Sequence, residues 1–196
     1  MASAHYIFGC VDCDLQRSYD SPAGDYAYQL LDGQQLPMLT GPSWCADCRN
    51  LSPAERLPSA EGEAALLKTL LCLRLDMANL LKEVPKKRPW WQFYAKPVNG
   101  LNQLESQISQ QEQQLDAYRT LRAALAERAS PARCLLCGST DHQPLTLPTK
   151  PDQPQVLSIT HPGCGGQLTV QISKQRTQKL GQKQLFDLEG RQFQNS

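Results

Sequence analysis

Three short motifs, each with two cysteines separated by two residues, constrain this chain more than any other feature of its sequence. The motifs are Cys10/Cys13, Cys45/Cys48 and Cys134/Cys137. A further cysteine, Cys164, follows His161 at the same spacing. One such turn presents two ligand atoms on a tight bend, and two turns together supply the four tetrahedral ligands of a structural zinc ion. The sequence therefore predicts a fold stabilised by metal.

Disulfides are the alternative use for eight cysteines. The start of the chain, Met1-Ala-Ser-Ala-His, has no basic segment and no long apolar run, which predicts no signal peptide. The strongest apolar run, Leu70–Leu73, is interrupted by Arg74, which predicts no membrane span and no membrane partner. We therefore expect a reducing cytoplasmic location, where paired cysteines favour metal binding over disulfides.

The pattern along the chain predicts an α+β fold in three parts. Residues 1–52 predict an N-terminal zinc-ribbon-like β module, with Asp32-Gly33 as a type I′ turn between two strands. Residues 59–130 predict an antiparallel two-helix hairpin joined by a basic and aromatic connector at 85–98. Residues 131–196 predict a second zinc-ribbon-like module that ends in a hairpin tail.

The two predicted helices differ in their apolar faces. In the first, expected over residues 59–83, one apolar stripe comprises Leu66, Leu70, Leu73, Met77, Leu80 and Val84. Leu67, Leu71 and Leu81 widen this stripe, so we expect burial on two sides. The second helix, expected over residues 101–129, has one apolar stripe and outer faces rich in glutamine. The lone Cys72 lies among these leucines and is expected to be a small core residue.

Two zinc sites follow if each is built from motifs that are near one another in the sequence. The first would comprise Cys10, Cys13, Cys45 and Cys48. The second would comprise Cys134, Cys137, His161 and Cys164. Glycines beside the ligands, Gly138 and Gly165 among them, allow tight turns around the metal. His142 is the alternative fourth ligand of the second site, whereas His5 is expected to be an ordinary strand residue.

These paired turns resemble the zinc-ribbon class, which implies a structural metal and no single function. The N-terminal segment also resembles rubredoxin, in an order of aromatic residues and cysteines that comprises Tyr6, Cys10, Cys13, Tyr19-Asp20, Leu36-Pro37 and Trp44-Cys45. That resemblance implies an iron site for electron transfer. Rubredoxin has glycine after each second cysteine and proline after the third, where this chain has Asp14, Arg49 and Ala46.

A binding surface is expected in the connector, where basic residues precede aromatic ones. Its members are Lys86, Lys87, Arg88, Trp90, Trp91, Phe93 and Tyr94. Such a segment suits a protein interface, a stacking platform for nucleic acid, or packing under the hairpin. The formal net charge of +1 gives no overall field that favours nucleic acid.

No catalytic motif is found, and with four protein ligands at each predicted site no coordination position is left for a substrate. We therefore expect a non-catalytic zinc protein with no small-molecule substrate. It would bind another protein, as an adaptor, a regulator or a toxin-neutralising partner. A zinc-ribbon protein that binds nucleic acid is the alternative, and an iron electron-transfer protein is the third.

Overall fold

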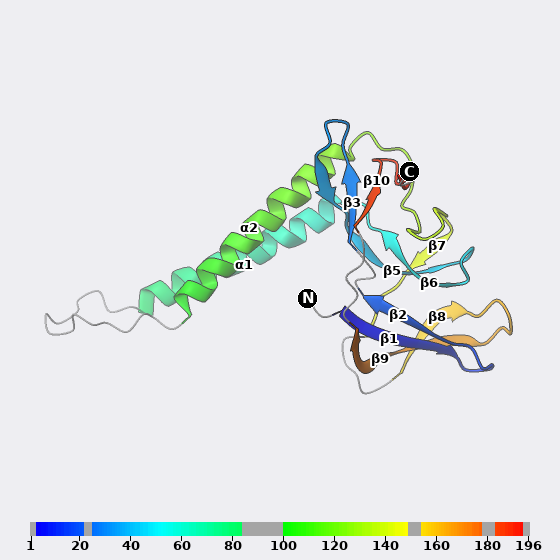
Figure 1. Ribbon diagram of the computed structural model, residues 1–196. Coiled ribbons are helices and arrows are strands. Elements are labelled where there is room, and N and C mark those ends of the chain that lie inside the picture. Colours follow the sequence, from blue (N-terminus) through cyan, green and yellow to red (C-terminus); the bar gives the residue numbers. More distant parts are fainter. Residues whose placement is uncertain (1–2, 22–24, 84–99, 149–153, 178–182, 194–196) are drawn as a thin grey trace, which may run out of the picture. The chain divides into compact units, whose positions relative to one another are not determined.

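The computed structural model describes residues 3–21, 25–83, 100–148, 154–177 and 183–193 (Figure 1). The fold is α+β, and the chain divides into two compact units. One unit combines Met1–Leu57 with Glu127–Ser196, and the other is the continuous segment Pro58–Ala126. The prediction of two separate cysteine modules is therefore wrong: the first and last parts of the chain fold together, and the helical segment is inserted between them.

The β unit contains three sheets within the described residues. The four-stranded sheet has the order β2 (Gln16–Ser21), β1 (Ser3–Cys10), β9 (Gln167–Thr177) and β8 (Gln155–Thr160). A second sheet has the order β10 (Gln184–Phe186), β3 (Tyr26–Gln29) and β4 (Gln35–Pro37). The third has the order β6 (Asn50–Glu55), β5 (Thr40–Cys45) and β7 (His142–Pro144). Each of the three sheets contains strands from both ends of the chain.

The hydrophobic core explains why the two ends of the chain pair. Alternate residues of β1, Tyr6 and Phe8, are buried with Leu168 and Val170 of β9, because side chains on one face of a strand recur every second residue. The antiparallel register sets Phe8 opposite Val170 and Cys10 opposite Leu168. The ring of Phe8 also meets Trp44 of β5 edge to face, with centroids 6.4 Å apart. The core thus joins the four-stranded sheet to the sheet that contains β5.

The predicted hairpin around Asp32-Gly33 forms between β3 and β4, but its turn is not of type I′. A type I′ turn needs a positive φ at both central residues, and of the two only Gly33, at 84°, has one. The Asp32 carboxylate instead accepts a hydrogen bond from the Gln34 backbone at 2.9 Å, and Leu30 and Gln34 close a longer loop. The local side-chain bond competes with the tighter turn.

A buried ion pair stabilises the start of the segment that follows α2. Arg128 contacts the Glu55 carboxylate at 2.7 and 3.0 Å, and the two side chains are 2% and 0% exposed. The same carboxylate accepts bonds from the Tyr28 hydroxyl and the Arg133 backbone. Burial and the neighbouring Glu55 raise the pKa of Tyr28, which keeps the phenol protonated and able to donate. This network fastens residues 128–133 to β3 and β6.

The helical unit contains α1 (Ala60–Glu83) and α2 (Leu101–Ala124), side by side in opposite directions (Figure 1). Glu63, near the start of α1, pairs with Arg119 and Arg122 near the end of α2. Arg74 and Glu112 pair near the middle of each helix. The second helix ends before the predicted residue 129, since the chain turns after Leu125 and Arg128 joins the buried pair.

The apolar stripe of α1 is sheltered as expected, but the wider apolar face is not. Leu70 is buried, and Leu66, Leu73, Met77 and Leu80 are partly buried; Val84 lies outside the described residues. The leucines that widen the stripe are exposed, so the expected burial on two sides is wrong. Cys72 is exposed as well, which corrects its assignment to the core. One neighbouring helix covers only one face of α1.

Replacing Arg128 by Met should lower the free energy of unfolding by about 3–5 kcal/mol, because Glu55 would remain buried without its partner. Urea denaturation followed by circular dichroism measures this. Arg191→Met is the matched control in the same unit, where an exposed side chain is removed at a cost within about 0.5 kcal/mol. Equal losses for the two variants would show that the buried pair contributes nothing specific.

Candidate metal centres

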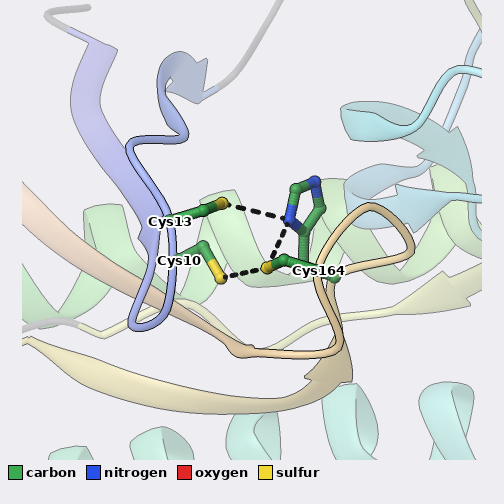
Figure 2. Close-up of side chains that lie close together, drawn as sticks. Cys10, Cys13 and Cys164 are labelled. Carbon is green, nitrogen blue, oxygen red and sulfur yellow. Dashed lines mark hydrogen bonds between the residues drawn. The ribbon is translucent and has the colours of Figure 1, made fainter.

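Two groups of four ligand side chains converge in the described part of the β unit. Cluster A comprises Cys10, Cys13, His161 and Cys164. Figure 2 shows Cys10 and Cys13 on one turn facing Cys164 on another. The sulfurs of Cys10 and Cys164 lie 3.3 Å apart, and Nδ1 of His161 lies 3.4 Å from the Cys13 sulfur and 3.2 Å from that of Cys164. The four ligand atoms therefore surround one point.

The strand register brings the two turns of cluster A together. β1 ends at Cys10, and β9 begins at Gln167 beside it, so the β1–β2 and β8–β9 turns emerge at the same edge. The Val11 backbone N–H donates to the Gln167 carbonyl at 3.0 Å, directly beside the cluster. A Cβ added at Gly166 would lie 2.7 Å from the Cys10 sulfur and from the Asp12 carboxylate. Only glycine at 166 allows the turns to approach this closely.

Cluster B comprises Cys45, Cys48, Cys134 and Cys137. The sulfurs of Cys45 and Cys137 are 3.6 Å apart, and those of Cys48 and Cys134 are 3.8 Å apart. Cys45 and Cys134 are buried, while Cys137 is exposed. Cluster A has no fully buried member, so the two clusters differ in their access to solvent.

Backbone pairing along β6 positions cluster B. Ala54 forms an isolated antiparallel bridge with Cys134, and the Leu135 N–H donates to the Pro53 carbonyl at 2.9 Å. This pairing places the Cys134/Cys137 turn against the β5–β6 turn that carries Cys45 and Cys48. Residues after the second ligand of three turns, Arg49, Gly138 and Gly165, have positive φ. Arg49 adopts this left-handed conformation although it has a Cβ, at a cost of about 1–2 kcal/mol.

The predicted grouping of the ligands is wrong, although all eight predicted ligands are present. Cys10/Cys13 joins His161/Cys164, and Cys45/Cys48 joins Cys134/Cys137. The sequence prediction assumed that neighbouring motifs share a metal. In the fold, β1 pairs with β9, and β6 runs beside residues 133–135, so each N-terminal motif meets a C-terminal one.

Both clusters have the dimensions of a tetrahedral zinc site. Thiolates at about 2.3 Å from a zinc ion lie about 3.8 Å from one another, and a nitrogen ligand lies slightly closer. The ligand-atom contacts of 3.2–3.8 Å are close to these lengths, and all ligand atoms of a cluster lie within 4.8 Å of one another. Both groups of four can therefore hold a metal ion.

The thiols of cluster A cannot all ionise easily without a cation. A backbone contact with Asp12 lowers the pKa of Cys10. For Cys164, the Gly166 backbone N–H favours the thiolate, but the neighbouring Cys10 and Cys13 thiols together with desolvation raise its pKa to about 11. A bound metal ion removes this conflict because it stabilises all the thiolates at once.

The pKa of one thiol in cluster B, that of Cys134, is lowered. Burial raises the pKa of Cys134, but the Ser52 hydroxyl and the backbone N–H groups of Leu136 and Cys137 outweigh burial and lower the pKa to about 7. The Cys134 sulfur and the Ser52 oxygen are 3.2 Å apart. Burial raises the pKa of Cys45 and Cys48, and neighbouring cysteines add to this. No sequence motif points to Ser52, because its role depends on the pairing of β6.

The other predicted site residues divide into two groups. His142 belongs to neither cluster: Nε2 hydrogen bonds to the Ala132 carbonyl at 3.0 Å, and its partly sheltered side chain faces no ligand set. His5 is a strand residue, as expected, and its Nδ1 pairs with Asp20 at 2.6 Å. The proposed partner-binding residues lie outside the described residues; they are Lys86, Lys87, Arg88, Trp90, Trp91, Phe93 and Tyr94.

No family model, curated protein or solved structure matches this chain. Among the helices in the described part of the chain, none is both long and apolar enough to cross a membrane.

Paired cysteine variants test the grouping directly. Cys13→Ser and Cys164→Ser should each remove the same ion, so the double variant should retain one ion per chain, whereas the double variant of Cys13 and Cys137 should lose both. Native mass spectrometry counts the ions, with Cys72→Ser as a control that keeps two. Loss of both ions from the Cys13/Cys164 double variant would restore the grouping expected from the sequence.

Ser52→Ala should weaken metal binding at cluster B, more strongly at pH 6 than at pH 8. The hydroxyl stabilises the Cys134 thiolate, so its removal raises that pKa and leaves more thiol to deprotonate as the pH falls. Competition with a chelator at the two pH values measures the difference. Ser43→Ala is the control, since that buried hydroxyl donates to the Ser52 carbonyl. A pH-independent loss would contradict the electrostatic role.

Proposed function

We propose that clusters A and B each hold one structural Zn²⁺ ion and that the protein acts without catalysis, by binding another protein. The observation that supports two metal sites is the convergence of four side-chain ligands at tetrahedral distances in each cluster. A structural zinc site is closed in this way, whereas a catalytic zinc keeps a coordination position for water. The proposal that the protein is not an enzyme follows from this closed ligand set.

The ligand types favour zinc over iron. Cluster A combines three thiolates with one imidazole, a common set for structural zinc. The resemblance to rubredoxin required Cys10, Cys13, Cys45 and Cys48 to share one iron, but these residues divide between the clusters. The four thiolates of cluster B would accept either metal. The electron-transfer hypothesis is therefore left without the four-cysteine iron site that the resemblance to rubredoxin implied.

Zinc would act on the β unit by joining distant parts of the chain. Cluster A links turns around residues 10–13 and 161–164, and cluster B links turns around 45–48 and 134–137. Closing such long loops removes conformational freedom from the unfolded chain. The sheets in the described residues have only three or four strands each, so metal binding would contribute much of the stability of this unit.

The proposed protein partner is supported by the sequence of the connector, in which Trp90 and Trp91 follow three basic residues. Adjacent aromatic and basic residues are typical anchors of protein interfaces. An adaptor, a regulator and a toxin-neutralising partner all use such a surface. A nucleic-acid-binding function would use the same residues and would weaken steeply as salt increases.

Elemental analysis of the purified chain should give two zinc ions per chain and no iron. His161→Ala should weaken or remove the ion of cluster A alone, because Nδ1 is one of its four ligand atoms. A matched His142→Ala variant should retain both. Iron with a visible absorption band would favour electron transfer, and an intact metal content in His161→Ala would remove this residue from the site.

The partner proposal is tested by comparing proteins captured by the wild-type chain and by a Trp90→Ala/Trp91→Ala variant. One defined protein should be enriched with the wild type and reduced at least about tenfold with the variant, as expected for interface anchors. Gln110→Ala, on the exposed face of α2, is the control. Salt-sensitive binding of DNA or RNA, lost in the same variant, would support the alternative function instead.

A further inference from the structure

The helical unit has a second apolar face, on α1, that α2 does not cover. Four leucines of α1 are exposed, Leu67 at 38%, Leu71 at 55%, Leu75 at 60% and Leu81 at 48%. At about 100° per residue they form one stripe with Ala64 and Ala78. This outer leucine stripe lies roughly 120° around the helix from the stripe that is sheltered beside α2. Helices in larger bundles carry two apolar faces of this kind.

The second helix does not offer a matching surface. Its exposed positions are mainly polar, with glutamines prominent among them, and none of its large apolar side chains is among those left exposed. The apolar face of another helix would cover the outer leucine stripe, and α2 does not supply one. The stripe itself is such a face, and α1 is about 36 Å long, enough for a continuous helix pair.

We propose that two copies of this chain associate through the outer leucine stripes of their α1 helices, packed antiparallel about a two-fold axis. Such an interface is isologous, because the same surface meets itself. The inference depends on neither metal cluster nor on residues 86–94. It adds self-association to the function proposed above.

The charges beside the stripe favour this antiparallel arrangement. The first turn of α1 carries Glu61 and its last turn carries Lys82, both exposed. In an antiparallel pair centred near Cys72, Glu61 approaches the partner's Lys82, and this contact occurs twice. A parallel pair would instead place Lys82 beside the partner's Lys82. In an antiparallel pair the dipoles of the two helices also point in opposite directions, which is favourable.

Another basic residue, Arg74, lies at the edge of the stripe, but its charge does not disfavour the antiparallel pair. Arg74 lies between Leu67 and Leu81 around the helix, but its guanidinium is bonded to Glu112 of α2 at 2.6 Å. Its charge is thus partly balanced within the same chain.

Sedimentation equilibrium of the full-length chain tests the proposal. The wild type should show twice the chain mass of 21.9 kDa. Leu71→Glu/Leu75→Glu should raise the dimer dissociation constant by about tenfold or more, because carboxylates would be buried in the interface. Gln110→Glu/Gln113→Glu adds the same charge to the exposed face of α2 and should leave it unchanged. A monomeric wild type, or a dimer that the leucine variant does not weaken, overturns the proposal.

A charge exchange tests the orientation and does not depend on the folding of the leucine variant. Lys82→Glu alone should weaken the dimer, and the addition of Glu61→Lys should restore it at least in part, since opposite charges then face each other again. Weakening without restoration overturns the antiparallel arrangement. Metal content, measured in parallel, should equal that of the wild type throughout.

Discussion

The antiparallel pairing of β1 with β9 is the interaction on which the rest of the β unit depends. It joins residues near the two ends of the chain, and its register sets Phe8 opposite Val170 in the core and Cys10 opposite Leu168 at the edge. The same pairing therefore buries the core and positions the turns of cluster A. A shift by one residue would turn the core side chains to the opposite face, and it would also separate the ligands.

The two clusters extend this long-range connection. Each one joins an N-terminal turn to a C-terminal turn, and the helical unit lies between these turns in the sequence. The buried Glu55–Arg128 pair reinforces the same connection close to the point where the chain returns from α2. Metal ligands, strand pairing and a buried ion pair thus all join residues before the helical unit to residues after it.

The clusters share a tetrahedral ligand set but differ in their surroundings. Cluster B contains two buried cysteines and a hydroxyl that favours one thiolate, whereas cluster A has an imidazole ligand and no fully buried member. Cys137 of cluster B is nevertheless exposed, as is Cys164 of cluster A, so each cluster has one exposed ligand. These differences arise from neighbours in the fold, since the spacing of the ligand motifs is the same.

The metal-ligand residues, the two helices and the α+β class were all predictable from local sequence patterns. Spacing of two residues between ligands is a local property of a turn, and the repeat of leucines is a local property of a helix, so both were predictable. The type of turn at Asp32 was predicted wrongly because a side chain bonded to the backbone there. The partner of each ligand pair is a long-range property. It was decided by the pairing of β1 with β9 and of β6 with residues 133–135, which side-chain burial selects and motif spacing does not encode.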